Sequence, residues 1–297
     1  MKLAVIVGPT ASGKTALALR LAEATGGEIV SADSQQVYRG MDIGTGKATP
    51  AERARVRHHL IDVVDPDDTM TAARFAGLAD QAIAEMDARG VPAIVAGGTG
   101  LYVRALLGGL FPGPAADPAV RARLEAESTE ALEARLAAVD PGARLLPGDR
   151  VRLIRALEVF ELTGRPISDW QREHREQAAA RYPSRIIGLA PPKDELGTRI
   201  DTRVDDMMAA GFLDEVRRLH AAGYAGARSL GAIGYRELGA HLGGELDLRA
   251  AILAIKQATR RYARRQLGWW RPDPAVAWYR SPGEVDLAEL TAWLRQP

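Results

Sequence analysis

Residues 8–15 read Gly-Pro-Thr-Ala-Ser-Gly-Lys-Thr, and this segment constrains the fold most because it fits the pattern G-x-x-x-x-G-K-S/T. The apolar run Lys2–Val7 precedes it, and the helix-like run Thr15–Glu23 follows it. A strand, a glycine-containing loop and a helix N-terminus together form a P-loop, whose backbone N–H groups and helix dipole attract phosphate. Taken alone, the pattern is typical of nucleoside triphosphate (ATP) binding. The residues predicted to line this phosphate site are Gly8, Pro9, Thr10, Ala11, Ser12, Gly13, Lys14 and Thr15, the last as a possible Mg²⁺ ligand.

The composition is that of a globular protein: 297 residues, 46% hydrophobic and 26% charged, with a net charge of +1. The chain has no cysteine, which excludes disulfides, thiolate metal sites and cysteine nucleophiles. Its five histidines show no metal-ligand spacing, so a packing or hydrogen-bonding role is the default for them. A strand that begins at Lys2 leaves no room for a signal peptide, and no apolar run approaches the roughly 20 residues that span a bilayer. We therefore expect a cytoplasmic protein.

Apolar strand-like runs alternate with helical runs in the N-terminal third and return near the C-terminus. This alternation predicts an α/β fold, a P-loop NTPase-like parallel sheet with flanking helices. Ligands of such sheets bind at the carboxyl ends of the strands. The predicted strands are Lys2–Val7, Glu28–Ala32, Leu60–Val64, Ala93–Ala96, Arg185–Leu189 and Val276–Tyr279, and the main helices start near Thr71, Lys193, Phe212 and Leu248.

The alternation stops at the breaker cluster Phe111-Pro112-Gly113-Pro114. From there to about Arg181 only helical patterns occur, which predicts an inserted helical domain over residues 113–183. The alternative is that these helices cover one face of the sheet. The core domain would then comprise residues 1–112 and 184–297.

Asp33 follows the second predicted strand, so its carboxylate should face the same crevice as the P-loop. There it could act as a general base toward an acceptor group. Aspartate and serine are also preferred helix N-caps, so capping is the alternative, and Asp33 and Ser34 could divide the two roles.

The fourth predicted strand ends in Gly97-Gly98-Thr99, where an ATP hydrolase would carry an acid that helps to hold Mg²⁺. The glycines permit close approach of a ligand or another backbone, and Thr99 offers a hydroxyl. A tight turn with positive φ is the alternative, and both can be true.

Arg199 and Arg203 lie four residues apart on a predicted helix that also carries aspartates. Most such clusters are solvated, ion-paired faces. One of these arginines could instead neutralise a phosphoryl or diphosphate group. The pattern leaves both possibilities open.

The predicted helix Leu248–Trp270 carries an apolar stripe that predicts core packing: Ile252, Ile255, Tyr262 and Trp269. Its arginines, Arg260, Arg261, Arg264 and Arg265, project to roughly the opposite side, and no acid occurs between Arg260 and Arg271. Like charges at this density repel unless a polyanion neutralises them. A second basic patch in the insertion contains Arg150, Arg152 and Arg155, and together the two patches predict a clamp for nucleic acid.

Blocks of sequence spread over nearly the whole chain closely resemble the bacterial tRNA dimethylallyltransferase (tRNA isopentenyltransferase) family. Only the P-loop is a strong signal alone, but the blocks occur together and in order, which makes the resemblance very specific. They are Gly8–Thr15, Asp33–Tyr38, Gly40–Thr45, His58–Asp62, Gly97–Tyr102, Arg155–Val159, Ile233–Glu237 and Arg264–Arg271.

The resemblance implies transfer of a dimethylallyl group from dimethylallyl diphosphate to N6 of adenine 37, next to the anticodon of tRNA, with diphosphate leaving. It also implies Mg²⁺ as cofactor and the anticodon stem-loop as partner, and we expect a monomer. Because no water attacks a γ-phosphate in this reaction, the resemblance explains the missing strand-end acid.

Individual roles are implied by the same resemblance. Lys14 holds the diphosphate with Thr15 near the metal, and Asp33 is the general base. Thr99 lies at the reaction centre, and Arg203 clamps the diphosphate. The residues expected to contact tRNA are Asp33, Ser34, Gln35, Gln36, Thr99, Arg121, Arg152, Arg155, Gly234, Tyr235, Arg236, Arg264, Arg265, Gln266, Trp269 and Arg271.

Two positions depart from the family pattern. Val151 stands where a glutamine is usual, and Gly268 stands where a threonine is usual. Each removes a possible polar contact to tRNA, and neither touches the expected reaction centre.

Three alternatives predict different chemistry. An adenylate prenyltransferase would use a free nucleotide, which needs neither the insertion nor the basic helix. A small-molecule P-loop kinase would turn over ATP, and the insertion could serve as its lid. A non-catalytic RNA-binding module would not need intact Lys14, Thr15 and Asp33.

Overall fold

The computed structural model describes residues 1–145, 148–177 and 179–296. By their contacts these form two compact units, a core unit of Met1–Leu107 and Arg181–Pro297 and a helical unit of Gly108–Ala180. The boundaries between the units lie after Leu107 and Ala180, slightly earlier in the chain than the boundaries that the sequence predicted after residues 112 and 183.

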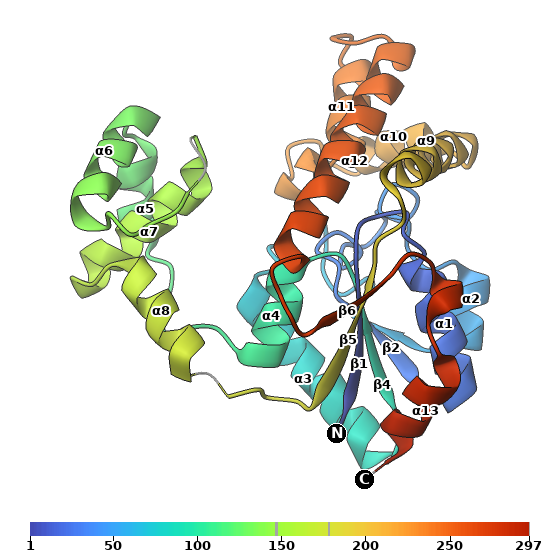
Figure 1. Cartoon of the computed structure of the whole chain (residues 1–297). Helices are drawn as coiled ribbons and strands as arrows, with labels where there is room; N and C mark the ends of the chain where they lie inside the picture. The colour runs from blue at the N-terminus through green and yellow to red at the C-terminus, as the bar shows by residue number, and fades with distance from the viewer. Residues whose placement is uncertain (146–147, 178, 297) are drawn as a thin grey trace. The chain divides into compact units, whose positions relative to one another are not determined.

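The core unit is built on a parallel sheet (Figure 1). Within the described ranges it has six strands in the order β3-β2-β4-β1-β5-β6. Its central strand β1 is buried on both faces, which is why its sequence is continuously apolar. The predicted α/β class is confirmed, and the strands are β1 Leu3–Val7, β2 Glu28–Ser31, β3 His58–His59, β4 Ala93–Ala96, β5 Ser184–Leu189 and β6 Val276–Tyr279.

Helices cover both faces of this sheet (Figure 1). One face packs Ile6 and Ile94 against Leu17 of α1 and Leu290 of α13. The other face, with Val5, belongs to a larger core that includes α3, α4 and the helices after β5. The bounds in the core unit are α1 Lys14–Thr25, α2 Pro50–Arg55, α3 Ala72–Ala88, α4 Gly100–Gly108, α9 Lys193–Ala209, α10 Phe212–Ala221, η1 Arg228–Gly231, α11 Tyr235–Leu242, α12 Leu248–Trp270, η2 Pro282–Glu284 and α13 Leu287–Arg295.

The prediction of a strand over Leu60–Val64 is wrong. Leu60 and Asp62 have φ values of 62° and 58°, and such left-handed backbone cannot continue an extended strand. The strand β3 lies just before this segment, and Val64 forms only an isolated bridge with Tyr38. Apolar composition therefore marked a buried loop here, not a strand.

The helical unit has its own apolar core, centred on Leu124, Leu136 and Leu157. The described part of this unit contains no strand, as the sequence predicted. Its helices are α5 Pro118–Glu125, α6 Thr129–Val139, α7 Arg150–Thr163 and α8 Ile167–Gln177.

None of the helices within the described ranges combines the length and the apolar composition that crossing a membrane requires.

Candidate active site

A cavity of about 660 Å³ lies in the core unit, where loops follow strands β1, β2 and β4. The P-loop forms one wall of the cavity, and the segment that starts at Asp33 forms another. Helix α9 contributes Arg203, and helix α12 contributes Tyr262 and Gln266. Four segments that the sequence singled out therefore meet at one cavity.

The P-loop has the backbone that a phosphate cradle needs. Helix α1 begins at Lys14, directly after Gly13 with φ 95°. A Cβ on Gly8 would lie 2.4 Å from the carbonyl oxygen of Leu189, so only glycine fits where β1 meets β5. Ala11 also has positive φ, 62°, which is strained for a residue with a side chain. The buried Ser12 hydroxyl has no hydrogen-bond partner among the described residues, so it is free to bind a ligand.

Two cations of the cavity lie near one carboxylate. Burial lowers the pKa of Lys14 to about 8, with Asp33 opposing this shift and Arg203 adding to it. Burial likewise lowers the pKa of Arg203 against the attraction of Asp33. Arg199 instead pairs with Glu195 on the same helix. Of the two arginines that the sequence left open, Arg203 is therefore the one at the cavity.

The segment after β2 is a turn, so the alternative that Asp33 caps a helix is wrong. Asp33 Oδ1 accepts a hydrogen bond from the Gln35 N–H at 2.9 Å, and the Ser34 N–H donates to Thr99 Oγ1 at 2.9 Å. Gln36 donates to the Gly46 carbonyl at 3.2 Å. These contacts fix the backbone that follows Asp33 and join it to the turn after β4.

The glycines after β4 serve close approach rather than a special turn. A Cβ on Gly97 would lie 2.1 Å from the Ala32 carbonyl oxygen, and one on Gly98 would lie 2.0 Å from Gln266 Nε2. Neither glycine has positive φ, so the alternative of a positive-φ turn is wrong. The turn after β4 therefore has no room for side chains where it approaches Ala32 and Gln266.

Helix α12 contributes differently from what its stripe predicted. Gln266 is buried, accepts from the Thr10 N–H at 2.8 Å and donates to the Gly98 carbonyl at 3.1 Å. Its side-chain amide is thus used within the protein, and the expectation that Gln266 contacts tRNA gains no support. Trp270 rather than Trp269 is the fully buried tryptophan. The ring of Trp269 packs on Gly100, as its indole carbon would lie 2.1 Å from a Cβ there.

Tyr262 is a cavity residue that the sequence assigned only to core packing. It lines the cavity, and its phenol neighbours Thr99 and Gln266. Burial raises its pKa, and Asp33 raises it further. The signal that could have found it is its position one helical turn before Gln266, on the same face of α12.

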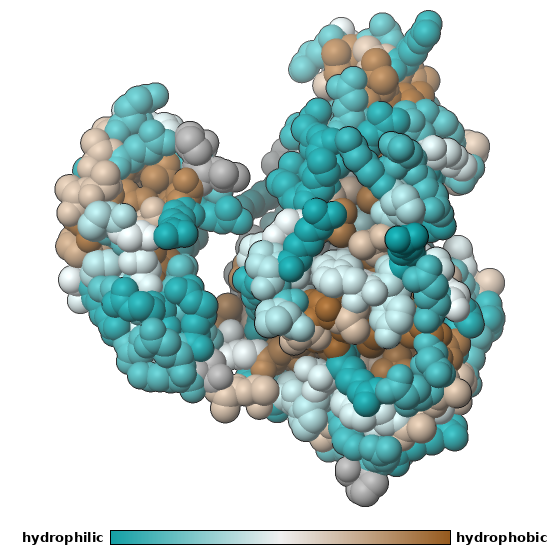
Figure 2. Space-filling model, in the orientation of Figure 1, coloured by the Kyte–Doolittle hydropathy of each residue, from teal (hydrophilic) through white to brown (hydrophobic). Residues whose placement is uncertain are grey.

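The arginines of α12 are exposed, and Figure 2 shows mainly hydrophilic side chains over the middle and lower part of the region that this helix occupies in Figure 1. Arg260 nevertheless pairs with Asp201 of α9, and Lys256 pairs with Asp205 at 2.7 Å. Acids of α9 therefore neutralise part of the charge of α12, and the prediction that only a polyanion could do so is wrong for Arg260. Arg265 stacks on Tyr262, with 5.5 Å from guanidinium carbon to ring centre.

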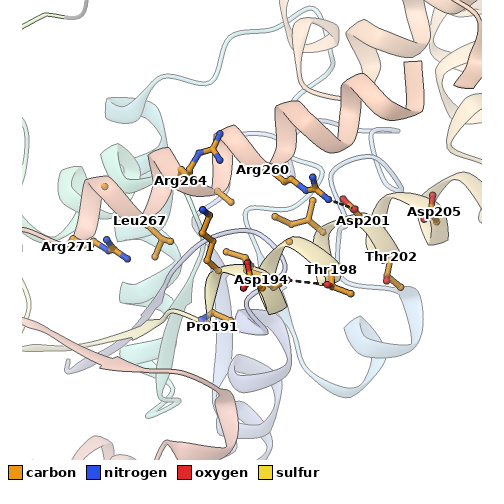
Figure 3. Close-up of a pocket in the computed structure, with 16 residues that line it drawn as sticks. Pro191, Asp194, Thr198, Asp201, Thr202, Asp205, Arg260, Arg264, Leu267 and Arg271 are labelled. Atoms are coloured by element: carbon orange, nitrogen blue, oxygen red, sulfur yellow. Dashed lines mark hydrogen bonds and ion pairs between the residues drawn. The ribbon is translucent and has the colours of Figure 1, made fainter. Parts of the chain in front are cut away.

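A second cavity, of about 890 Å³, lies between α9 and α12 (Figure 3). Leu196 of α9 and Leu267 of α12 are among its lining residues. Arg264 and Arg271 stand along its α12 side. Neither of these two arginines forms a salt bridge within the described ranges. Both side chains are exposed and therefore open to an external anion.

In the helical unit, the second basic patch is already paired. Arg121 and Arg155 both hydrogen-bond the fully buried carboxylate of Glu158. Burial alone would raise the pKa of Glu158, but these hydrogen bonds outweigh burial and lower it. Arg152 pairs with Asp149 at 2.8 Å, and Arg150 donates to the Glu125 and Glu127 carbonyls at the end of α5 and just after it.

Glu215 organises another loop of the cavity. Its carboxylate accepts hydrogen bonds from the Asp42, Ile43 and Gly44 N–H groups at 2.7–3.1 Å. The Tyr235 hydroxyl donates to it as well, at 2.6 Å, so this expected tRNA contact is buried and engaged. The two neighbouring residues that were also expected to contact tRNA differ in exposure. Gly234 is buried with φ 94°, whereas Arg236 is exposed and paired with Glu237.

The metal-ligating side chains form no obvious metal centre. Within the described residues, no three histidine, cysteine or acidic side chains converge on one point. His59 contacts Glu28 at 2.6 Å, and His58 contacts the Val56 carbonyl, which fits the hydrogen-bonding role expected for both. A cation here would have to rely on hydroxyls and on the oxygens of a bound ligand.

A protein-family comparison matches residues 36–273 to the IPP transferase family. The chain is 51% identical to a tRNA dimethylallyltransferase of Geobacter sulfurreducens, over 98% of this chain and 96% of that protein.

Solved structures agree. The crystal structure of the full-length tRNA isopentenylpyrophosphate transferase of Bacillus halodurans superposes with a TM-score of 0.73 at 40% identity, covering 99% of this chain and 95% of that one. A eukaryotic dimethylallyltransferase acting on tRNA superposes with a TM-score of 0.81 at 27% identity, covering 98% of this chain and 77% of that one.

Proposed function

The chain belongs to the IPP transferase family, and on that premise we propose that it transfers a dimethylallyl group from dimethylallyl diphosphate to N6 of adenosine 37 in tRNA. The observation that carries the proposal is the meeting of Lys14, Arg203 and Asp33 at one cavity on a P-loop. These groups provide two cations for a departing diphosphate and one carboxylate for an acceptor proton.

The charges suit the departure of a diphosphate. When the carbon–oxygen bond of an allylic diphosphate breaks, positive charge spreads over the prenyl group and negative charge gathers on the leaving group. Lys14, Arg203 and the P-loop N–H groups oppose that negative charge as it grows. The free Ser12 hydroxyl offers a further donor beside them.

Asp33 suits the acceptor side. As N6 attacks the prenyl carbon, the amine becomes acidic, and a nearby carboxylate can take its proton. The hydrogen bond from the Gln35 N–H keeps one Asp33 oxygen fixed. The target base has to leave the stack of the anticodon loop to reach this carboxylate.

We also propose Mg²⁺ as cofactor. Mg²⁺ commonly takes only one or two protein ligands and completes its shell with phosphate oxygens and water. The lack of an acidic cluster among the described residues fits this sparse donor set, and Thr15 at the start of α1 would supply the hydroxyl ligand. Bound there, the ion would add positive charge beside the leaving diphosphate.

The RNA-binding surface is proposed to include α12. Arg264 and Arg271 are exposed and carry no internal ion pair among the described residues, as a phosphate-binding surface requires. Asp33, Ser34, Gln35 and Gln36 would meet the flipped base at the cavity.

One assay tests the proposal against its alternatives. The protein is incubated with dimethylallyl diphosphate and Mg²⁺ together with unmodified tRNA or AMP, and separately with ATP alone. Prenylation of tRNA, mapped to N6 of adenosine 37, is the expected result. Transfer to AMP but not to tRNA, or ATP turnover without prenyl transfer, would overturn it in favour of an adenylate prenyltransferase or a kinase.

A further inference from the structure

Gln266 connects two loops of the cavity that are far apart in sequence. Its side chain is 5% exposed, and both of its amide heavy atoms form hydrogen bonds. Oε1 accepts from the Thr10 N–H at 2.8 Å, and Nε2 donates to the Gly98 carbonyl at 3.1 Å. One side chain of α12 thus holds the P-loop and the turn after β4 at a fixed separation.

On the P-loop side, the bond falls next to strained backbone. Thr10 precedes Ala11, whose φ of 62° is unfavourable for a residue with a Cβ. Such a conformation persists only where surrounding contacts enforce it. The Gln266 bond to the preceding N–H is one such contact, and the backbone donors of the cradle follow directly.

On the other side, the bond leads to the proposed base. Gly98 precedes Thr99, whose hydroxyl accepts from the Ser34 N–H, and Ser34 follows Asp33. A Cβ on Gly98 would collide with Gln266, so the turn and the amide are fitted to each other. Movement of the Gln266 amide would therefore displace the turn that orients Asp33.

We propose that Gln266 is a positioning residue for prenyl transfer, and that it acts by fixing the P-loop relative to the Thr99–Asp33 side rather than by contacting tRNA. This inference rests on the proposed function. The neighbouring arginines of α12 are exposed, whereas Gln266 points into the core unit. Substituting Gln266 and substituting these arginines should therefore affect different measurements, diphosphate binding and turnover in the first case and tRNA binding in the second.

The test compares Gln266→Met, which keeps the length of the side chain but can form neither bond, with Gln257→Met on the exposed face of the same helix. For Gln266→Met we expect kcat for tRNA prenylation to fall about 10- to 100-fold. We also expect several-fold increases in KM for dimethylallyl diphosphate and in Kd for inorganic diphosphate. The Kd for tRNA should stay within about twofold of the parent, which also shows that the variant is folded. Gln257→Met should change none of these values.

Gln266→Glu gives a second readout should the methionine variant fail to fold. It keeps the acceptor for the Thr10 N–H, loses the donor to Gly98 and adds a negative charge, so diphosphate binding should weaken most. A loss of tRNA affinity with unchanged diphosphate binding would overturn the inference in favour of a tRNA contact. A lower Tm with unchanged kcat and KM would overturn it in favour of a structural role alone. If the parent protein fails to prenylate tRNA while Gln266→Met still weakens diphosphate binding, the proposed function fails and the positioning of the P-loop stands.

Discussion

Two charged clusters of this protein differ in whether their charges are satisfied internally. In the helical unit, the carboxylate of Glu158 is fully buried and receives hydrogen bonds from Arg121, Arg155 and the Asp117 N–H. In the cavity of the core unit, Lys14 and Arg203 face Asp33, yet none of the described residues forms a salt bridge with any of these three. One cluster is closed, and the other leaves its charges available.

The difference indicates what each cluster is for. A buried carboxylate with several strong donors orders the helices around it, and its removal is costly because the partners lose their counter-charge. Cations held near a carboxylate without pairing carry a desolvation penalty that a bound anion can relieve. The first arrangement stabilises the fold, and the second provides a site.

The largest effect is expected at the open cluster. Asp33→Asn should lower kcat for tRNA prenylation by about 10²- to 10⁴-fold, because the amide cannot take the proton from N6. Stability should change little, since Asp33 has no ion pair among the described residues to lose. The measurement is steady-state kinetics with a parallel thermal melt and a tRNA-binding titration. An equal loss of tRNA affinity would instead identify Asp33 as a recognition residue.

The closed cluster should respond in the opposite way. Glu158→Gln should lower the free energy of unfolding by about 3 kcal/mol, because Arg121 and Arg155 lose their counter-charge. The lowered pKa of Glu158 means that its stabilisation is present above the ordinary pKa of 4.5 and is lost as the pH falls through the lowered value.

Denaturant unfolding of the full chain, followed at neutral and acidic pH, measures both effects. Glu125→Gln, at an exposed position of the same unit, is the matched control and should change stability by less than about 0.5 kcal/mol. A Glu158 variant of normal stability but reduced tRNA affinity would show that the arginines of this cluster serve RNA first.

The contrast between the clusters also shows how far the sequence could be interpreted. Lys14 and Asp33 could be found because each lies in a segment that directly follows a predicted strand, and the strand–loop–helix context places such residues at one sheet edge. The α/β class followed from the alternation of strands and helices for the same reason. The residue pattern alone left Arg199 and Arg203 both open, and only the family resemblance selected Arg203.

The predictions that the structure contradicts depended on contacts between segments far apart in the sequence. The partner of Arg260 lies on another helix, so charge counted along α12 could not reveal it. The amide of Gln266 is used by loops 256 and 168 residues away. The left-handed backbone at Leu60 is set by tertiary packing, which no local apolar pattern encodes.

The arginines of α12 allow the same comparison within one helix. Arg264→Ala with Arg265→Ala should weaken tRNA binding several-fold and flatten the plot of log Kd against log salt by about 1 for each phosphate that is no longer neutralised. Arg260→Ala is the control, because Arg260 is already paired with Asp201 and should alter the salt slope less. Titrations of tRNA between low and high salt measure both. Equal slopes for the two variants would mean that internal pairing does not decide which arginines bind RNA.

The smallest effect concerns the proton on Lys14. Burial, opposed by Asp33 and reinforced by Arg203, lowers the pKa of Lys14 to about 8, so the free protein loses this charge as the pH rises above 8. We expect KM for dimethylallyl diphosphate to rise several-fold between pH 7.5 and about 9, while kcat changes less because bound diphosphate retains the proton. The titration of Lys14 does not itself promote unfolding: with a folded pKa below the ordinary 10.5, the unfolded chain binds more protons between the two values, so Lys14 makes folding more favourable as the pH increases. Lys14→Arg keeps its charge throughout this range, and its KM should stay flat; a rise of the same size in that variant would assign the titration to another group.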